Sequence, residues 1–173
     1  MGALYRIQQF LRAVGSWVRP SDGPGEIAGR YLPPAAVRLF EGMSRYDQRH
    51  ALNVCLALER QGHTEPDLLA AALLHDVGKS VASGARIRLW HRVAVVLIQV
   101  AAPGLLGRLA KDEPGNWRQP FHVQLHHAAI GAEAAKQAGC SAATADLIRR
   151  HEDAPGHATD PLFAALHAAD SEN

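Results

Sequence analysis

An apolar segment near the middle of the chain ends in the string Leu73-Leu74-His75-Asp76-Val77-Gly78-Lys79. His75 and Asp76 place two metal-ligating side chains of different chemistry next to each other in a segment that is otherwise typical of a buried helix. A buried carboxylate without a partner is costly, so a metal ion or another cation is the natural partner of Asp76. An imidazole binds one ion through a ring nitrogen, whereas a carboxylate has two oxygens and can bridge two ions. The pair alone is weak evidence and needs matching residues elsewhere.

Four matching residues occur at or near the ends of other predicted helices: His50, His127, His151 and Asp170. Side chains at such positions can converge on one cavity of a helical bundle. Neutral imidazoles with carboxylates suit iron or manganese best, with cobalt, nickel, zinc or magnesium as alternatives, and disfavour calcium. Six protein ligands exceed the need of one catalytic ion and suit two ions about 3.5–4 Å apart, with Asp76 as the bridge. Taken singly, each histidine would favour the alternative of an ordinary buried, hydrogen-bonded polar group, and only the set as a whole favours metal binding.

The apolar spacing predicts an all-α fold, because the chain reads as helical almost throughout and has neither strand alternation nor an internal repeat. We expect an amphipathic helix at 1–20, a glycine-rich linker at 21–30, and a helical domain at 31–173 with about six to eight helices. Cap signatures mark several helix ends: Thr64 and Asp160 as N-caps, Ser141 or a neighbour as a third, and Gly62 and Gly78 as stops. Helices are expected at about 33–44, 46–61, 65–77, 87–100, 105–110, 121–138, 141–151 and 160–170.

Length and composition set limits on the class of protein. With 173 residues, 47% apolar residues and a net charge of +1, the chain fits one globular domain and gives no reason to expect a stable nucleic-acid complex. Cys55 and Cys140 show no metal-type spacing and favour buried thiols in a reducing compartment. No signal peptide is visible, and the longest uncharged stretch, 93–107, is shorter than a spanning helix requires. A cytoplasmic location is expected.

Two tracts without acidic residues interrupt this balanced charge. Residues 77–111 and the first 21 residues contain basic side chains and no Asp or Glu. The tracts could face an anionic substrate, anionic lipid at the inner face of a membrane, or acidic parts of the same fold. The apolar stretches 4–18 and 90–109 leave parallel alternatives open: packing on the core, a homodimer contact, a peripheral membrane contact, or, for the second stretch, a lid over the substrate.

The ordered set of ligand residues resembles the HD-domain superfamily of metal-dependent phosphohydrolases. The string His127-Ala-Ala-Ile-Gly131-Ala132-Glu133 is similar to the family's His-x-x-x-Gly-Ala-Glu helix, and Arg150-His151-Glu152 is similar to its fourth His motif. The string Leu166-His167-Ala168-Ala169-Asp170 is similar to the closing Ala-Asp motif. The resemblance covers about residues 45–170 and implies a bundle of packed helices with phosphoester hydrolase activity. The subset with dinuclear sites, which includes bacterial hydrolases of bis-nucleoside tetraphosphates, is the most similar.

Departures from the family patterns narrow the substrate. Cyclic-dinucleotide phosphodiesterases of this superfamily carry Gly-Tyr-Pro after the fourth His motif, where this chain has Ala154-Pro155-Gly156-His157. Trinuclear members carry a Glu one turn before the first His, where this chain has Tyr46. The signature that tetraphosphate hydrolases carry beyond the final Asp is not present before Asn173. A third metal and cyclic-dinucleotide specificity are therefore disfavoured.

These observations predict a metal-dependent phosphohydrolase that acts on a nucleotide or another small phosphoester through a metal-activated hydroxide. Asp76 is the predicted catalytic bridge, and Lys79 is predicted to neutralise a substrate phosphate, with a solvated lysine as the alternative. A non-catalytic module that senses a nucleotide or a metal is the alternative function. Further candidates for substrate contacts are Arg45, Arg149, Arg150 and His126, while the Gly131 register favours His127 over His126 as the residue that faces the cavity.

Overall fold

Helices are the regular elements of this protein throughout the part that is described, which comprises residues 24–81, 94–95, 97–98, 103–113, 116–153 and 160–173 of a computed structural model. This confirms the all-α prediction. The predicted helix at 1–20 and most of the predicted helix at 87–100 lie outside these ranges. Within them the nine helices are α2 (Pro24–Tyr31), α3 (Pro34–Glu41), α4 (Arg45–Arg60), α5 (Pro66–Leu74), α6 (Gly78–Val81), α8 (Pro103–Leu109), α9 (Gln119–Gln137), α10 (Ala142–Arg150) and α11 (Pro161–Glu172).

Helix α2 corrects the prediction of a linker at 21–30. Its glycines weaken a helix by about 1 kcal/mol each relative to alanine, which is why the sequence favoured a linker. Ile27 and Ala28 are nevertheless buried in the core, and Glu26 and Arg30 form an ion pair of 3.6 Å on the exposed side. Burial of this apolar face outweighs the low intrinsic helix propensity of the segment.

Most helix ends follow the predicted caps. Ser141 accepts a hydrogen bond from the amide of Thr144, and Asp160 accepts from the amides of Leu162 and Phe163. Gly62 follows α4 with a φ of 91°, a left-handed conformation that favours glycine.

The predicted Thr64 cap is wrong by one residue. Glu65 is the N-cap of α5, and its extended backbone, with φ −66° and ψ 115°, is the conformation that the following Pro66 imposes.

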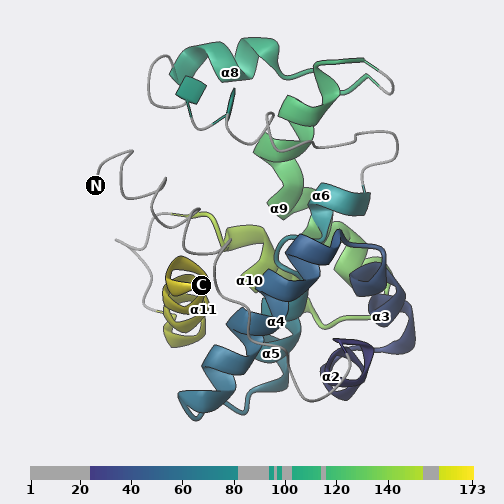
Figure 1. The fold of residues 1–173 in the computed structure, drawn as a ribbon, viewed down its shortest axis with the longest axis vertical. Helices are drawn as coiled ribbons and strands as arrows, with labels where there is room; N and C mark the ends of the chain where they lie inside the picture. The colour runs from purple at the N-terminus through teal and green to yellow at the C-terminus, as the bar shows by residue number, and fades with distance from the viewer. Residues whose placement is uncertain (1–23, 82–93, 96, 99–102, 114–115, 154–159) are drawn as a thin grey trace.

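Helix α5 runs through the centre of the main apolar core. Every residue from Leu68 to Leu74 is buried, as expected for a helix that is apolar on all sides. It packs against α2, α3, α4, α10 and α11, which together form the lower body of the molecule in Figure 1. Because α5 ends at Leu74, it delivers the next two residues, His75 and Asp76, into the interior.

Two glycines allow α6 and α9 to touch backbone to backbone. A Cβ atom on Gly78 would lie 2.0 Å from the carbonyl oxygen of His127, and one on Gly131 would lie 3.0 Å from the amide nitrogen of Gly78. Gly78 thus begins the short helix α6 instead of stopping a helix, as the sequence had suggested. The contact brings the segment that carries Asp76 against the middle of α9.

A second, smaller apolar cluster lies at the other end of the molecule. Val95, Leu106 and Phe121 are its buried residues, and α8 packs there against the beginning of α9. Figure 1 shows α8 at the top, far from α2 and α5, with α9 connecting the two ends. None of the helices in the described ranges is long and apolar enough to cross a membrane.

Candidate metal centre

The six predicted ligands converge from the helices of the main core. His50 lies within α4, His75 and His151 are the C-caps of α5 and α10, and Asp76 follows His75. His127 and Asp170 lie within α9 and α11. Two sets of three have potential ligand atoms that all lie within 4.8 Å of one another: His50 with His75 and Asp76, and Asp76 with His127 and His151. Asp76 is common to both sets.

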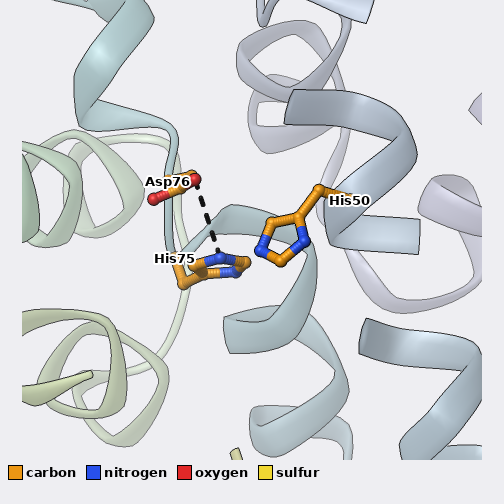
Figure 2. A group of neighbouring side chains, drawn as sticks. All are labelled: His50, His75 and Asp76. Carbon is orange, nitrogen blue, oxygen red and sulfur yellow. Dashed lines mark ion pairs between the residues drawn. The ribbon is translucent and has the colours of Figure 1, made fainter. Parts of the chain in front are cut away.

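The first ligand group consists of His50, His75 and Asp170. The carboxylate Oδ1 of Asp170 lies 2.8 Å from Nε2 of His50 and 3.5 Å from Nε2 of His75. Figure 2 shows the His50 ring and the Asp76 carboxylate both turned toward the ring of His75, whose Nε2 lies 3.8 Å from Oδ2 of Asp76. This group therefore faces one oxygen of Asp76.

The second ligand group consists of His127 and His151, which are both buried. Their Nε2 atoms lie 3.4 and 3.9 Å from Oδ1 of Asp76, and their ring centroids are 5.2 Å apart. The two oxygens of Asp76 thus face different groups, Oδ2 toward the first and Oδ1 toward the second. A carboxylate that bridges two ions requires this division.

Three of the imidazoles are oriented by their own helices. The Nδ1 atoms of His75, His127 and His151 each lie within hydrogen-bond distance of a backbone carbonyl three residues earlier. When Nδ1 donates that bond, Nε2 is left with a lone pair that points to the centre, as metal-binding histidines require. The carbonyls belong to Ala72, Gln124 and Ile148, at 2.9, 2.9 and 2.7 Å.

Burial and neighbouring charges move the pKa values of His75 and His151 in opposite directions. Burial lowers the pKa of His75, but the carboxylates of Asp76 and Asp170 outweigh it and raise the pKa to about 9. Burial, followed by the charge of His75, lowers the pKa of His151 to about 3.

The pKa values of the two carboxylates fall despite burial. Burial alone would raise the pKa of Asp76 and of Asp170. Lys79 and His75 hold the pKa of Asp76 well below its usual range, and His75 and His50 do the same for Asp170. The centre therefore holds two ionised carboxylates.

One nitrogen of the site lacks a hydrogen-bond partner. Nε2 of His127 is buried and forms no hydrogen bond, although such atoms are paired in most proteins. Its nearest charged neighbours are carboxylate oxygens, which cannot donate a proton when ionised. A divalent ion would satisfy this atom, and four imidazoles with two carboxylates form a donor set suited to iron or manganese. The residues present therefore fit the predicted ions.

Lys79 lies at the edge of this centre. Its ammonium is 2.5 Å from Oδ1 of Asp76, and its side chain is only 13% exposed. The alternative of a solvated lysine is therefore wrong, because the group is paired with the predicted bridging carboxylate.

The other predicted substrate contacts divide into exposed and paired residues. Arg45 and Arg149 are exposed. Arg150 instead pairs with Asp146 at 2.6 Å and Asp160 at 2.8 Å, so it joins α10 to the start of α11. Because both ion pairs engage the guanidinium within the fold, they argue against the predicted contact of Arg150 with the substrate.

Adjacent histidines on α9 point in different directions. His127 is fully buried at the centre, whereas His126 is exposed and packs on the ring of His122 with centroids 4.4 Å apart. Successive residues of a helix differ by about 100°, which separates the two rings. The register that favoured His127 as the inward residue is confirmed.

Glu152 belongs to this region although the sequence analysis gave it no role. Its Oε1 atom lies 3.6 Å from Nε2 of His127, and its side chain is 52% exposed. The available signal was its position directly after His151, at the end of α10.

No protein-family model, curated protein or solved structure matches this chain. The resemblance to the HD-domain superfamily therefore rests on the motif residues alone.

Proposed function

We propose that this protein is a metal-dependent phosphohydrolase of the HD-domain type that acts on a nucleotide or another small phosphoester. The observation that carries the proposal is the position of Asp76, whose two oxygens face two separate sets of imidazoles. A site that needed only one ion, or a buried polar cluster, would not require a carboxylate shared in this way.

The donor atoms divide into two sets that could each hold one ion. His50, His75 and Asp170 with Oδ2 of Asp76 would hold the first, and His127 and His151 with Oδ1 of Asp76 the second. Two divalent ions so bound would supply Lewis acidity toward a phosphoryl group and a hydroxide nucleophile near neutral pH.

The protein's own contribution is to orient these ligands and to neutralise charge. The bonds from Nδ1 to backbone carbonyls fix three imidazole rings, so the ligands need little reorganisation on metal binding. Lys79 lies on Asp76 at the margin of the site, and from there its ammonium can attract the oxygens of a phosphate. Arg45 and Arg149 remain exposed candidates for contacts with a larger nucleotide.

The test is metal analysis of the purified protein together with turnover of a generic phosphodiester and a panel of nucleotides that includes a bis-nucleoside tetraphosphate. Bound transition metal and hydrolysis that falls by roughly 10²-fold in His75→Ala support the proposal. Absence of bound metal, or hydrolysis that His75→Ala leaves unchanged, contradicts it. Tight nucleotide binding with no product after hours would instead support the sensing module. Asp153→Asn is a suitable control, because Asp153 is exposed and follows the site without joining it.

A further inference from the structure

We infer that Glu152 is a seventh protein ligand, which holds the second ion together with His127, His151 and Asp76. The inference rests on the proposed dinuclear site and extends it, because the motif resemblance assigns no role to this glutamate.

The position of Glu152 allows it to reach the centre from the surface. It follows His151 where α10 ends, so its backbone is placed by the same helix end as a predicted ligand. Its side chain is 52% exposed, yet Oε1 lies 3.6 Å from Nε2 of His127, which is fully buried. One side of the carboxylate thus faces solvent while an oxygen faces the second ligand group.

Two carboxylate oxygens from different parts of the chain lie near the same nitrogen of His127. Nδ1 of His127 is bonded to the carbonyl of Gln124, so Nε2 carries a lone pair. That lone pair faces Oδ1 of Asp76 at 3.4 Å and Oε1 of Glu152 at 3.6 Å. Lys79 contacts Asp76 but leaves Nε2 of His127 without a hydrogen bond. Acceptors gathered in this way repel one another unless a cation lies among them.

The spacing of these atoms fits a shared ion. Ligand bonds of about 2.1 Å place neighbouring ligand atoms about 3.0–3.4 Å apart, from octahedral to tetrahedral geometry. The contacts of His127 Nε2 to the two carboxylate oxygens, 3.4 and 3.6 Å, lie at or just beyond the upper end of that range. A small rotation of the exposed Glu152 side chain would close the difference.

Glu152 would also make the two halves of the centre equivalent. The first ion has two imidazoles, the carboxylate of Asp170 and one oxygen of Asp76. Without Glu152, the second ion has two imidazoles and only the other oxygen of Asp76. With Glu152, each ion has two imidazoles, one carboxylate of its own and one oxygen of the shared Asp76 carboxylate. We therefore expect Glu152 to determine how tightly the second ion is held.

The experiment is titration of the metal-stripped protein with Mn²⁺, followed by calorimetry and by electron paramagnetic resonance. Wild type should bind two ions per chain. Glu152→Gln should keep the first ion at wild-type affinity and bind the second at least roughly 10- to 100-fold more weakly, because that is already the cost of losing a group that only supports a ligand. Glu152→Asp, which keeps the charge on a shorter side chain, should fall between the two. Asp153→Asn is the matched control, since it removes the neighbouring exposed carboxylate, and should titrate as wild type.

Several outcomes decide, without a measurement of catalysis, whether Glu152 is a ligand of the second ion. Equal affinities for the second ion in wild type and Glu152→Gln would overturn the inference, as would a wild type that binds fewer than two ions. A lower thermal stability of metal-free Glu152→Gln with unchanged Mn²⁺ binding would also overturn it, because it would show that Glu152 is only an ion-pair partner of His127. Loss of the second ion in Glu152→Gln, combined with no hydrolysis of any phosphoester by wild type, would support the inference and remove the proposed phosphohydrolase activity.

Discussion

The two ligand groups share Asp76 but differ in what their imidazoles meet in the absence of an ion. In the first group, Asp170 lies within 2.8 Å of His50 and 3.5 Å of His75, so each imidazole has a carboxylate partner outside the bridge. In the second group, Nε2 of His127 is buried without a hydrogen bond. The first group thus includes a short contact between an imidazole and a carboxylate of its own, whereas the second leaves a buried imidazole nitrogen without a hydrogen bond even though Lys79 contacts Asp76.

One imidazole of each group also has a shifted pKa, and the two shifts are opposite. With a pKa of about 9, His75 carries an extra proton at neutral pH in the metal-free protein and balances its carboxylates, and a bound ion would displace that proton. With a pKa of about 3, His151 is neutral over the whole physiological range. The comparison suggests that the first group contributes to the stability of the fold, while the second is organised for ligand binding.

Asp76→Asn should have the largest effect, because it alters the only side chain that the two groups share. We expect loss of both ions and a decrease in hydrolysis of more than about 10³-fold, measured by metal analysis and steady-state turnover. Asp153→Asn should leave both unchanged. If Asp76→Asn retains one ion at full affinity, Asp76 does not bridge and the two groups are independent.

His75→Ala and His127→Ala should each remove one ion and leave the other. Either change should lower turnover by roughly 10²-fold. The stabilities should differ, since His75→Ala leaves Asp170 and Asp76 short of a positive partner, whereas His127→Ala removes an unpaired nitrogen. Urea unfolding of the metal-free variants tests this difference. Equal destabilisation by both changes would contradict the proposed division of roles.

Gly78→Ala should disturb the second group more than the first, because its Cβ would meet the carbonyl of His127 at 2.0 Å. Separation of α6 and α9 should cost about 3 kcal/mol of unfolding free energy and weaken the second ion. Gly131→Ala, whose Cβ meets its nearest neighbour at 3.0 Å, should cost about 1 kcal/mol. Gly29→Ala is the control, since a Cβ there meets nothing within 4 Å. Chemical denaturation measures the loss of stability, and Mn²⁺ titration measures the affinity for the second ion. Equal losses of stability in Gly78→Ala and Gly29→Ala would refute the role of the contact between α6 and α9.

Asp160→Asn should have the smallest effect. A hydrogen bond from Arg150 is the main cause that lowers the pKa of Asp160 in the folded state. The carboxylate therefore stabilises the fold above its unfolded pKa of about 3.9, and that contribution is lost as the pH falls through the lower folded-state value. Because the side chain is 34% exposed, the contribution is at most about 0.5 kcal/mol.

The measurement for Asp160→Asn is urea unfolding at pH 7 and at pH 3. The variant should be slightly less stable than wild type at pH 7, and the two should converge as the pH approaches 3. A difference that grows toward low pH would contradict this assignment.

Local patterns in the sequence were enough to predict most of the described helices and to single out six side chains that the structure brings together. His75 and Asp76 at the end of an apolar helix, and caps such as Ser141 and Asp160, are signals that depend on neighbouring residues only. The order of the remaining ligands along the chain supplied the rest of the centre.

Features that depend on tertiary packing were missed. Helix α2 was mistaken for a linker because its stability comes from burial of Ile27 and Ala28, not from its glycine-rich composition. Gly78 was predicted to stop a helix, because no neighbouring residue in the sequence indicates that the backbone of α9 packs against it. Glu152 and the pairs of Arg150 likewise depend on which helix ends meet in space.

The contact between His50 and Asp170 joins residues that are 120 positions apart. During synthesis the first group therefore cannot close until α11 has been made, although α4, α5, α9 and α10 are already available to pack. Until then His50 and His75 would lack the terminal carboxylate, and any ion they met would be held weakly. The second group needs no residue of α11, so its ion could be bound first, and tight binding of the ion at His50 and His75 would follow only after α11 had packed.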